Sequence, residues 1–348
     1  MNAGLKSGTI IHARAPVRNA DLGGWRDTRL FDHGFVLNFA IRLYTYVTLS
    51  SRQDAAIELE GQDVGETERI ADIRAIEYDG ALSLIKAALT SSQMKAGGFH
   101  MAVRSEAPPA SGLGSSAAVG VSALGALHRL NGQVRLPYQI ASEAQRLETE
   151  ILHQECGVQD QLCSAYGGIN YIEVRYPEAH VMPVHLAPGT LLDLEARSLV
   201  VYTGKSHFSS GTHKSVISHF EMGDPNTIDA MDRLNETAEW GLRSLLADDL
   251  EGYAEALNYN WTQQKRLHPT ITTPQVEAMH EAVLDAGAIG FKLNGAGAGG
   301  TAMVLCRHDR VHTVRDRLQE EFPEAVIFPM KLDIGQHQGM QVWETRRR

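Results

Sequence analysis

The chain has 348 residues, 43% of them hydrophobic and 21% charged, with a formal net charge of −10 at pH 7. This length exceeds the roughly 250–300 residues that one hydrophobic core fills, so we expect two domains or one large domain, and the acidic balance argues against nucleic acid or an anionic membrane as the main partner. The sequence has three cysteines and no CxxC pair. It also has no apolar run long enough for a signal peptide or a membrane span. We therefore expect a protein of the reduced cytoplasm.

Strands dominate the predicted elements of the first half of the chain. In chain order we expect strands at 9–14 and 34–49, a helix at 78–89, a strand at 99–106, helices at 115–130 and 136–155, and strands at 168–174 and 199–203. The long second strand is predicted from β-branched and aromatic residues in near alternation. The helix at 115–130 is predicted from its run of alanine and leucine.

Helices dominate the second half. We expect helices at 227–246, 251–264 and 273–286, a strand–glycine loop–strand unit at 290–306, a helix at 311–322 and a strand at 325–332. Because strands and helices are segregated along the chain, the pattern predicts an α+β protein and not a doubly wound sheet. The composition changes near residue 190, so we place a domain boundary there, with domains at 1–190 and 191–348.

A segment rich in glycine and serine, PPASGLGSSAA at 108–118, joins a predicted strand to an apolar helix. Glycines let the backbone approach an anion closely, and the helix offers unpaired N–H groups and the positive end of its dipole. The segment contains no GK[ST] and is therefore not a Walker A loop. Taken alone, it predicts either a triphosphate site or an ordinary capped helix after a flexible loop.

A second glycine-rich segment, FKLNGAGAGGTAMVL at 291–305, separates two apolar strands. A hairpin turn needs one or two glycines rather than four. The excess predicts backbone packed closely against a ligand or against another loop, with a mobile hairpin as the alternative.

Three segments, in this order, resemble those of the GHMP kinases, the family of galactokinase, homoserine kinase, mevalonate kinase and phosphomevalonate kinase. They are ARAPVRNADLGGWRDT at 13–28, PPASGLGSSAA, and KLNGAGAGG at 292–300. The resemblance spans nearly the whole chain. It implies ATP-dependent phosphoryl transfer, with an N-terminal domain like ribosomal protein S5 domain 2 and a ferredoxin-like C-terminal α/β sandwich. The implied contacts of the ATP phosphates are Pro109, Ser111, Gly112, Leu113, Gly114, Ser115, Ser116 and Ala117, and the implied third-motif loop is Gly295, Ala296, Gly297, Ala298 and Gly299.

A fourth segment, ECGVQDQLCSAYGG at 155–168, resembles the galactokinase-like GxxDQ segment whose aspartate is the catalytic base. The resemblance assigns this role to Asp160, which would orient the acceptor hydroxyl and take its proton. Arg18 matches the first-motif arginine beside the base, and a cation there favours the ionised carboxylate. Glu148 matches the magnesium glutamate, with Ser116 as the second protein ligand. The alternative for Glu148 is a helical glutamate that faces solvent.

The first motif departs from that of galactokinase, because GGWRDT stands where that enzyme has a GEHTD-like run. Gly24 and Trp25 fill the Glu and His positions, which argues against galactose as the substrate. Asp27 falls where the galactokinase aspartate binds sugar hydroxyls. We expect Trp25 either to stack on the sugar ring or to pack in the core.

The run GGWxDT followed by HGFVLNFAI is most similar to two branches that phosphorylate an anomeric C1 hydroxyl. These are the D-glycero-D-manno-heptose 7-phosphate kinases and the kinase domain of fucokinase. Later segments such as AYGGIN and YTGKSHFSSGTHKS favour the heptose kinases. A sugar phosphate would need a basic pocket; the alternative is that the basic residues form a solvated polar loop. The candidates for the pocket are Arg29, Lys205, His207, His213 and Lys214.

The sequence therefore predicts a sugar 1-kinase that uses ATP and Mg2+ and is a monomer or homodimer. The predicted acceptor is heptose 7-phosphate, or else unphosphorylated fucose, glucuronate or arabinose. Two further alternatives stay open: a non-catalytic regulator that binds sugar and ATP on the same fold, and a kinase of mevalonate or homoserine. The retained Arg18, Glu148 and Asp160 argue against a regulator, and the GxxDQ and GGWRDT segments argue against other acceptors.

Overall fold

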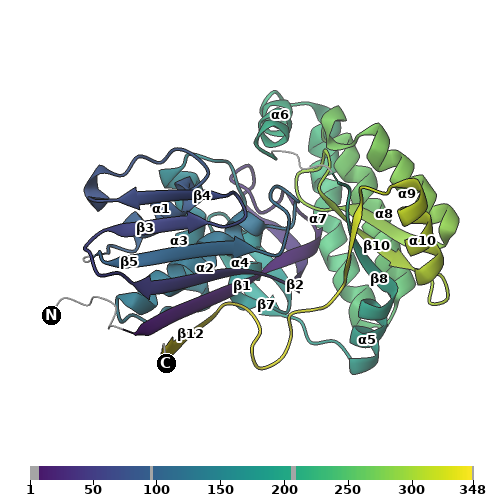
Figure 1. The fold of residues 1–348 in the computed structure, drawn as a ribbon. Coiled ribbons are helices and arrows are strands. Elements are labelled where there is room, and N and C mark those ends of the chain that lie inside the picture. Colours follow the sequence, from purple (N-terminus) through teal and green to yellow (C-terminus); the bar gives the residue numbers. More distant parts are fainter. Residues whose placement is uncertain (1–7, 95–96, 205–208, 347–348) are drawn as a thin grey trace.

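Two β-sheets, each with its own helices, form the fold of the computed structural model, which describes residues 8–94, 97–204 and 209–346 (Figure 1). The larger sheet has the strand order β12-β1-β2-β5-β3-β4, with β6 paired to β2 and β7 to β6. Its strands are β1 (Thr9–Leu22), β2 (Gly34–Ser51), β3 (Ile57–Gly61), β4 (Glu66–Ile70), β5 (Phe99–Ser105), β6 (Ile169–Arg175), β7 (Glu178–Pro183) and β12 (Gln341–Arg346). The smaller, antiparallel sheet has the order β11-β8-β10-β9. Its strands are β8 (Ser198–Tyr202), β9 (Ala288–Leu293), β10 (Thr301–Cys306) and β11 (Val326–Pro329).

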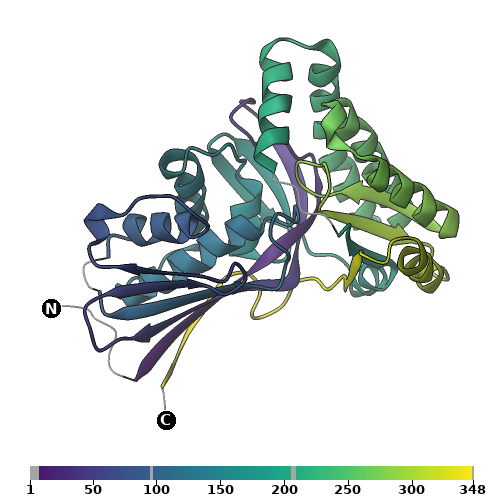
Figure 2. The ribbon, with the colours of Figure 1, turned by 45° about the horizontal axis from the view of Figure 1, so that its top comes forward.

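Helices pack on each sheet, and two of them link the two parts. The helices of the first part are α1 (Ser83–Ser91), α2 (Ser115–Leu130), α3 (Pro137–Arg146) and α4 (Gln159–Tyr166). Those that follow are α5 (Pro188–Arg197), α6 (Ser209–Glu221), α7 (Pro225–Leu246), α8 (Leu250–Arg266), α9 (Pro274–Ala286) and α10 (Val311–Glu321). Helix α8 packs on β9 and also contacts β1, and α7 packs on α8, β1 and β2. Figure 2 shows β1, in purple, running from the larger sheet to the junction of the two parts.

Helix α2 is the central helix of the first part. Most of its residues are buried, because it packs on β1, β2, β5, α1, α3 and α4. A helix surrounded in this way needs apolar residues on every side, which explains its run of small and branched apolar residues. The backbone N–H of Arg18 on β1 donates to the carbonyl of Leu113 at 2.9 Å. This contact fixes the start of α2 beside the end of β1, at the junction of the two sheets.

The first strand is longer than predicted. It was expected to end at residue 14 but extends to Leu22. Its second half carries Arg18, Asn19 and Asp21, which interrupt the apolar pattern, yet all three are buried. Buried polar groups are stable where they have hydrogen-bond partners. These residues pair with distant parts of the chain, and therefore the hydrophobic pattern of the sequence did not predict this half of the strand.

The single helix predicted at 136–155 is wrong. Helix α3 ends at Arg146, a π-helical turn follows at Leu147–Ile151, and α4 starts at Gln159. His153 has a φ of +53°, which an L-residue in a helix does not adopt, so the chain turns there. The break places Asp160 in the first turn of a helix that the sequence pattern did not predict.

Several exposed elements were also missed. Strands β4 and β12 are charged and mostly exposed, so they lack the alternation that marks a half-buried strand. Strand β12 pairs with β1, which returns the chain to the larger sheet after the smaller one is complete. The α+β prediction is confirmed, whereas the division at residue 190 stays a prediction. In the parts of the chain that the structure describes, every helix is too short or too polar to span a bilayer.

Candidate active site

Two glycine-rich loops meet at the junction of the two sheets: the first glycine loop (108–118) and the second glycine loop (295–300). The backbone N–H and the hydroxyl of Thr301 both donate to the carbonyl of Ser111, at 2.7 and 3.0 Å. A Cβ at Gly300 would lie 2.5 Å from that carbonyl oxygen, and a Cβ at Gly112 would lie 2.8 Å from the carbonyl oxygen of Asn294. The glycines thus allow two backbones to pack against each other, as expected for contact with another loop.

The first glycine loop ends at the N-terminus of α2. Gly114 is the N-cap residue with a φ of +69°, and no side chain of the described residues caps the helix. The N–H of Ala118 donates to the carbonyl of Gly114 at 3.1 Å. The three preceding N–H groups, of Ser115, Ser116 and Ala117, lie before this first helical bond and have no acceptor within the helix. Together with the helix dipole they form a site suited to an anion, not a side-chain-capped helix.

Asp160 and Arg18 form an ion pair beside this helix end. Nε of Arg18 donates to Oδ1 of Asp160 at 2.7 Å, and Nη2 donates to Oδ2 at 3.4 Å. Nη1 of Arg18 donates to the carbonyl of Gly112 at 2.5 Å. A Cβ at Gly114 would lie only 3.0 Å from Oδ2 of Asp160. The Arg18 side chain is 4% exposed and that of Asp160 29%, so the carboxylate remains accessible while the cation is enclosed.

Two further buried charges, Asp21 and Lys292, were not predicted. Nζ of Lys292 donates to Oδ1 of Asp21 at 2.9 Å, and Nη1 of Arg18 lies 3.5 Å from the same oxygen. Burial alone would raise the pKa of Asp21, but the two cations outweigh it, so the pKa lies below its ordinary value. Asp21 therefore balances a buried arginine and a buried lysine. A lone lysine within the apolar strand β9 was the signal that could have revealed this network.

Ser116 and Glu148, which were predicted as a pair, lie together. Oγ of Ser116 donates to Oε2 of Glu148 at 3.1 Å, and Nε2 of Gln161 donates to Oε1 at 2.8 Å. The Glu148 side chain is buried in the π-helical turn, so it does not face solvent as the alternative had it. Burial raises the pKa of Glu148 to about 7, although the two hydrogen bonds oppose this shift.

Asp27 lies beneath the start of α4. Its Oδ2 accepts from the backbone N–H groups of Val158 and Gln159, at 3.0 and 3.1 Å, and Oδ1 accepts over a longer distance, 3.4 Å, from Nε2 of Gln159. Burial raises the pKa of Asp27 to about 6. The carboxylate thus holds the helix that carries Asp160. A Cβ at Gly24 would lie 3.4 Å from Nε2 of Gln159, so this glycine lies in the same region.

Residues of the first motif also contact α6. The ring of Trp25, which is buried, lies 4.8 Å from the ring of His213. Arg29 donates to the carboxylates of Glu155 and Glu221, at 3.0 and 3.3 Å. These contacts tie the loop after β1 to α6 and to the segment before α4.

The predicted basic pocket is only partly visible. Lys205 and His207 lie outside the described residues, and Lys214 is exposed on α6. The guanidinium of Arg29 is already engaged by two carboxylates. Arg29 would have to exchange these partners to hold a phosphate.

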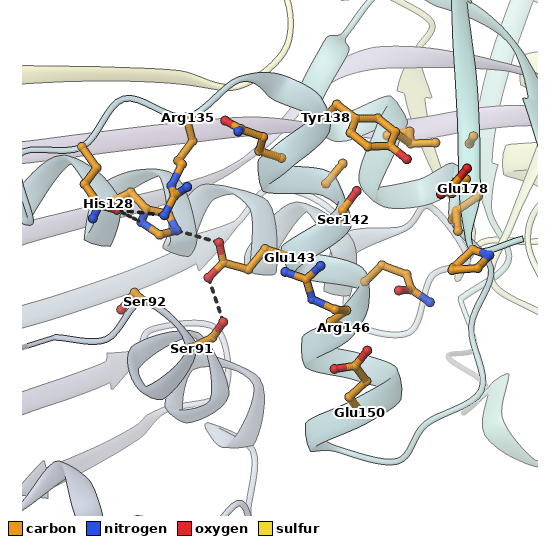
Figure 3. Close-up of a pocket in the computed structure, with 18 of the residues that line it drawn as sticks. Ser91, Ser92, His128, Arg135, Tyr138, Ser142, Glu143, Arg146, Glu150 and Glu178 are labelled. Carbon is orange, nitrogen blue, oxygen red and sulfur yellow. Dashed lines mark hydrogen bonds and ion pairs between the residues drawn. The ribbon is translucent and has the colours of Figure 1, made fainter.

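A separate hollow of about 670 Å³ lies along α3, between the ends of α1 and α2 and the β6–β7 turn (Figure 3). At its centre Glu143 bonds to Ser91 and His128, each at 2.7 Å, and His128 bonds to Gln133 at 2.9 Å. These polar groups satisfy one another. The hollow is lined by neither glycine loop and by none of Arg18, Glu148 and Asp160.

The packing of the two loops predicts different effects for two glycines of similar backbone conformation. Gly112 has a φ of +75° and Gly132 a φ of +70°, but a Cβ at Gly132 would meet nothing within 4 Å. We expect Gly132→Ala to lower the free energy of unfolding by about 1 kcal/mol through the left-handed backbone alone. Gly112→Ala must also separate the loops, so we expect a total loss of about 2–4 kcal/mol and a KM for ATP raised about tenfold. Urea unfolding and ATP titrations of turnover measure both effects; equal behaviour of the two variants would contradict this role of the loops.

Family models identify the group of proteins to which this site belongs. The model of the GHMP kinases N terminal domain matches residues 78–168, and that of the GHMP kinases C terminal domain matches 242–324, together half of the chain. The chain belongs to the GHMP kinases. It is therefore an ATP-dependent phosphotransferase, and the predicted family and fold are confirmed. The N-terminal match contains the first glycine loop, Glu148 and Asp160, and the C-terminal match contains the second glycine loop.

Individual GHMP kinases resemble the chain over most of its length. A D-glycero-α-D-manno-heptose 7-phosphate kinase of Campylobacter jejuni is 27% identical over 301 residues, which are 83% of this chain and 87% of that protein. The bifunctional fucokinase/GDP-fucose pyrophosphorylase of Arabidopsis thaliana is 27% identical over 88% of the chain, which spans 31% of that protein. The crystal structure of a D-glycero-D-manno-heptose 1-phosphate kinase from Bacteroides thetaiotaomicron superposes with a TM-score of 0.78 over 96% of this chain and 98% of that one, at 24% identity. This last likeness shows a shared fold.

Proposed function

We propose that this GHMP kinase transfers the γ-phosphoryl group of ATP to the anomeric C1 hydroxyl of a sugar, with D-glycero-D-manno-heptose 7-phosphate as the substrate. The observation that carries the proposal is the partly exposed carboxylate of Asp160, held by Arg18 directly beside the N-terminus of α2. A base and a phosphate site are thereby adjacent. The sugar is inferred from the GGWRDT segment and from the heptose kinase and fucokinase among the relatives.

Phosphoryl transfer requires positioning and charge neutralisation more than covalent chemistry. The N–H groups at the start of α2 would hold the β- and γ-phosphates, with the backbone from Pro109 to Gly114 shaping the site. The second glycine loop, which includes Gly295 to Gly299, packs against that backbone and would hold it in place. Asp160 would accept the proton of the C1 hydroxyl as the oxygen attacks phosphorus. Arg18 would hold the carboxylate pointed at the acceptor.

The described residues around Ser116 fit Mg2+. The Ser116 hydroxyl and the Glu148 carboxylate are hard oxygen donors 3.1 Å apart, and Oε1 of Gln161 nearby is buried without a hydrogen-bond partner among the described residues. A cation would also offset the cost of burying Glu148. In the part of the chain that the structure describes, no three His, Cys, Asp or Glu side chains form a metal site. This agrees with Mg2+, which takes few protein ligands and fills its shell with phosphate oxygens and water. Bound Mg2+ would neutralise charge on the transferring phosphates.

The sugar would bind between α6 and the loop that follows β1 at 23–33, here called the first-motif loop. Oδ1 of Asp27, whose contact with Nε2 of Gln159 is long at 3.4 Å, would accept from a sugar hydroxyl. A Cβ at Gly24 would lie 2.9 Å from Oδ2 of Asp21, so this position has no room for the glutamate side chain that galactokinase has there. The buried Trp25 ring would form a wall of the site. Arg29 and Lys214, with Lys205 and His207, stay the candidates for a distal phosphate. If this phosphate site is absent, an unphosphorylated sugar such as fucose becomes the better substrate.

The magnesium assignment predicts a difference between two neighbouring glutamates of one turn. Glu148→Gln keeps the shape and removes the charge, so we expect apparent Mg2+ affinity to fall about tenfold or more. Glu150→Gln, at an exposed position two residues later, should leave it unchanged. Isothermal titration of Mg2+ into enzyme with a non-hydrolysable ATP analogue measures this affinity. An unaltered affinity in Glu148→Gln would remove this residue from the metal site.

The proposed function is tested by turnover of a sugar panel. Purified enzyme with Mg-ATP is assayed for ADP release with heptose 7-phosphate, fucose, glucuronate, arabinose, mevalonate and homoserine. We expect the highest kcat/KM with heptose 7-phosphate. A higher kcat/KM with an unphosphorylated sugar would identify that sugar as the substrate in place of heptose 7-phosphate. Turnover of mevalonate or homoserine alone would show that the protein is not a sugar kinase. Binding of sugar and ATP without any turnover would identify a regulator.

A further inference from the structure

Two contacts hold His213 beside the proposed sugar site. Its ring lies 4.8 Å from that of Trp25, at an angle of 58°. Its Nδ1 lies 3.2 Å from the backbone carbonyl oxygen of Glu155, in the segment that leads into α4. Glu155 precedes α4, the helix that carries Asp160. Helix α6 thus brings one imidazole to the place where the acceptor would lie.

The contact with Glu155 fixes the tautomer of His213. A carbonyl oxygen only accepts hydrogen bonds, so Nδ1 must carry the proton and donate. Burial lowers the pKa of His213, which favours the neutral ring at physiological pH. In a neutral ring protonated at Nδ1, Nε2 is a bare acceptor. Within the described residues, Nε2 makes no hydrogen bond.

We propose that Nε2 of His213 accepts a hydrogen bond from a hydroxyl of the acceptor sugar, and that this contact selects for a sugar with a hydroxyl at that position. The inference rests on the proposed function, because it assumes a polyol beside Asp160. It differs from the sequence-based expectation, in which His213 would be one of the cations around a phosphate. A neutral acceptor recognises an O–H donor and is repelled by a phosphate oxygen, so the two roles exclude each other.

The position of α6 supports this role. The Phe31 and Phe220 rings lie 4.9 Å apart, and Arg29 reaches Glu221. Both contacts fix the far end of α6 against the first-motif loop. The helix that carries the imidazole is therefore held by packing at its C-terminal end. Such support is what a specificity contact needs to hold its geometry.

The test compares His213→Phe with His219→Phe on the same helix. The first substitution keeps a ring against Trp25 but removes the acceptor, whereas His219 packs on His268, 4.6 Å away. We expect His213→Phe to lower kcat/KM for heptose 7-phosphate roughly tenfold, the effect of one lost neutral hydrogen bond, mostly through the KM of the sugar. The KM of ATP should not change, and His219→Phe should behave as wild type. His213→Gln, whose amide oxygen can accept near the Nε2 position, should recover part of the loss.

Deoxygenated substrates decide which group His213 contacts. Wild type and His213→Phe are assayed with heptose 7-phosphate and with its 2-deoxy, 3-deoxy and 4-deoxy analogues. For one analogue, the kcat/KM of the wild type should fall about tenfold relative to heptose 7-phosphate. The kcat/KM of His213→Phe should be the same for that analogue as for heptose 7-phosphate. If wild type is active and the variant loses equally with every analogue, the inference is overturned while the proposed function stands. A loss restricted to phosphorylated sugars would instead make His213 a phosphate ligand. If wild type turns over no sugar, both fail.

Discussion

Replacing Asp160 by asparagine should reduce kcat by about 10²–10⁴-fold, the usual contribution of a positioned general base. Asparagine has nearly the same shape, and its oxygen can still accept from Nε of Arg18. It cannot take the proton of the acceptor hydroxyl. ATP binding should be almost unchanged, because the phosphate site is built from backbone N–H groups of α2 and not from Asp160.

Rapid-quench measurements of the chemical step and equilibrium binding of an ATP analogue test this prediction together. Asp316→Asn, at an exposed position on α10, controls for the loss of one negative charge. A urea unfolding curve for each variant shows that the fold is intact. Unchanged turnover in Asp160→Asn would remove this residue as the base. Loss of ATP binding in the same variant would show that Asp160 acts on the nucleotide.

Removing the Arg18 guanidinium should be costly for both stability and activity. Arg18→Met leaves Asp160 without its closest partner, and it leaves the carbonyl of Gly112 without its donor. Breaking a buried ion pair from one side costs about 3–5 kcal/mol. Turnover should fall by about a hundredfold or more as well, because the carboxylate loses the group that orients it.

Arg74→Met provides the matched control for Arg18. The Arg74 side chain is 90% exposed and pairs with Asp72 at 3.0 Å, so its loss should leave the stability almost unchanged. Combining Arg18→Met with Asp160→Asn separates the pair from general packing. The second substitution removes the stranded charge, so the stability cost of Arg18→Met should shrink in that background. If Arg18→Met lowers the stability equally with and without Asp160→Asn, the ion pair with Asp160 does not account for the stabilising effect of Arg18.

Short motifs allowed parts of the candidate site to be predicted from the sequence. Arg18 with Asp160, and Ser116 with Glu148, were predicted as neighbours and lie within hydrogen-bond distance. The two glycine loops were expected to approach a ligand or another loop, and they pack against each other. The roles of these residues in catalysis and metal binding stay predictions.

Other parts of the site depend on long-range pairing that local patterns do not encode. Asp21 and Lys292 meet only because β9 of the smaller sheet lies against β1 of the larger one. Asp27 accepts hydrogen bonds from the start of α4, which begins at Gln159. The sequence pattern predicted one helix at 136–155 and no helix at α4, so this contact could not be predicted. Helix α6 was missed because its residues show no clear helical periodicity, and its position follows from contacts with the first-motif loop.

Product analysis by NMR tests the central claim most directly. Enzyme, Mg-ATP and D-glycero-D-manno-heptose 7-phosphate are incubated, and the phosphorus and proton spectra of the sugar product are recorded. We predict a second phosphorus resonance coupled to the anomeric proton, with ADP formed in equal amount. A new phosphate coupled to any other sugar proton, or ADP formed without a sugar bisphosphate, would contradict the account.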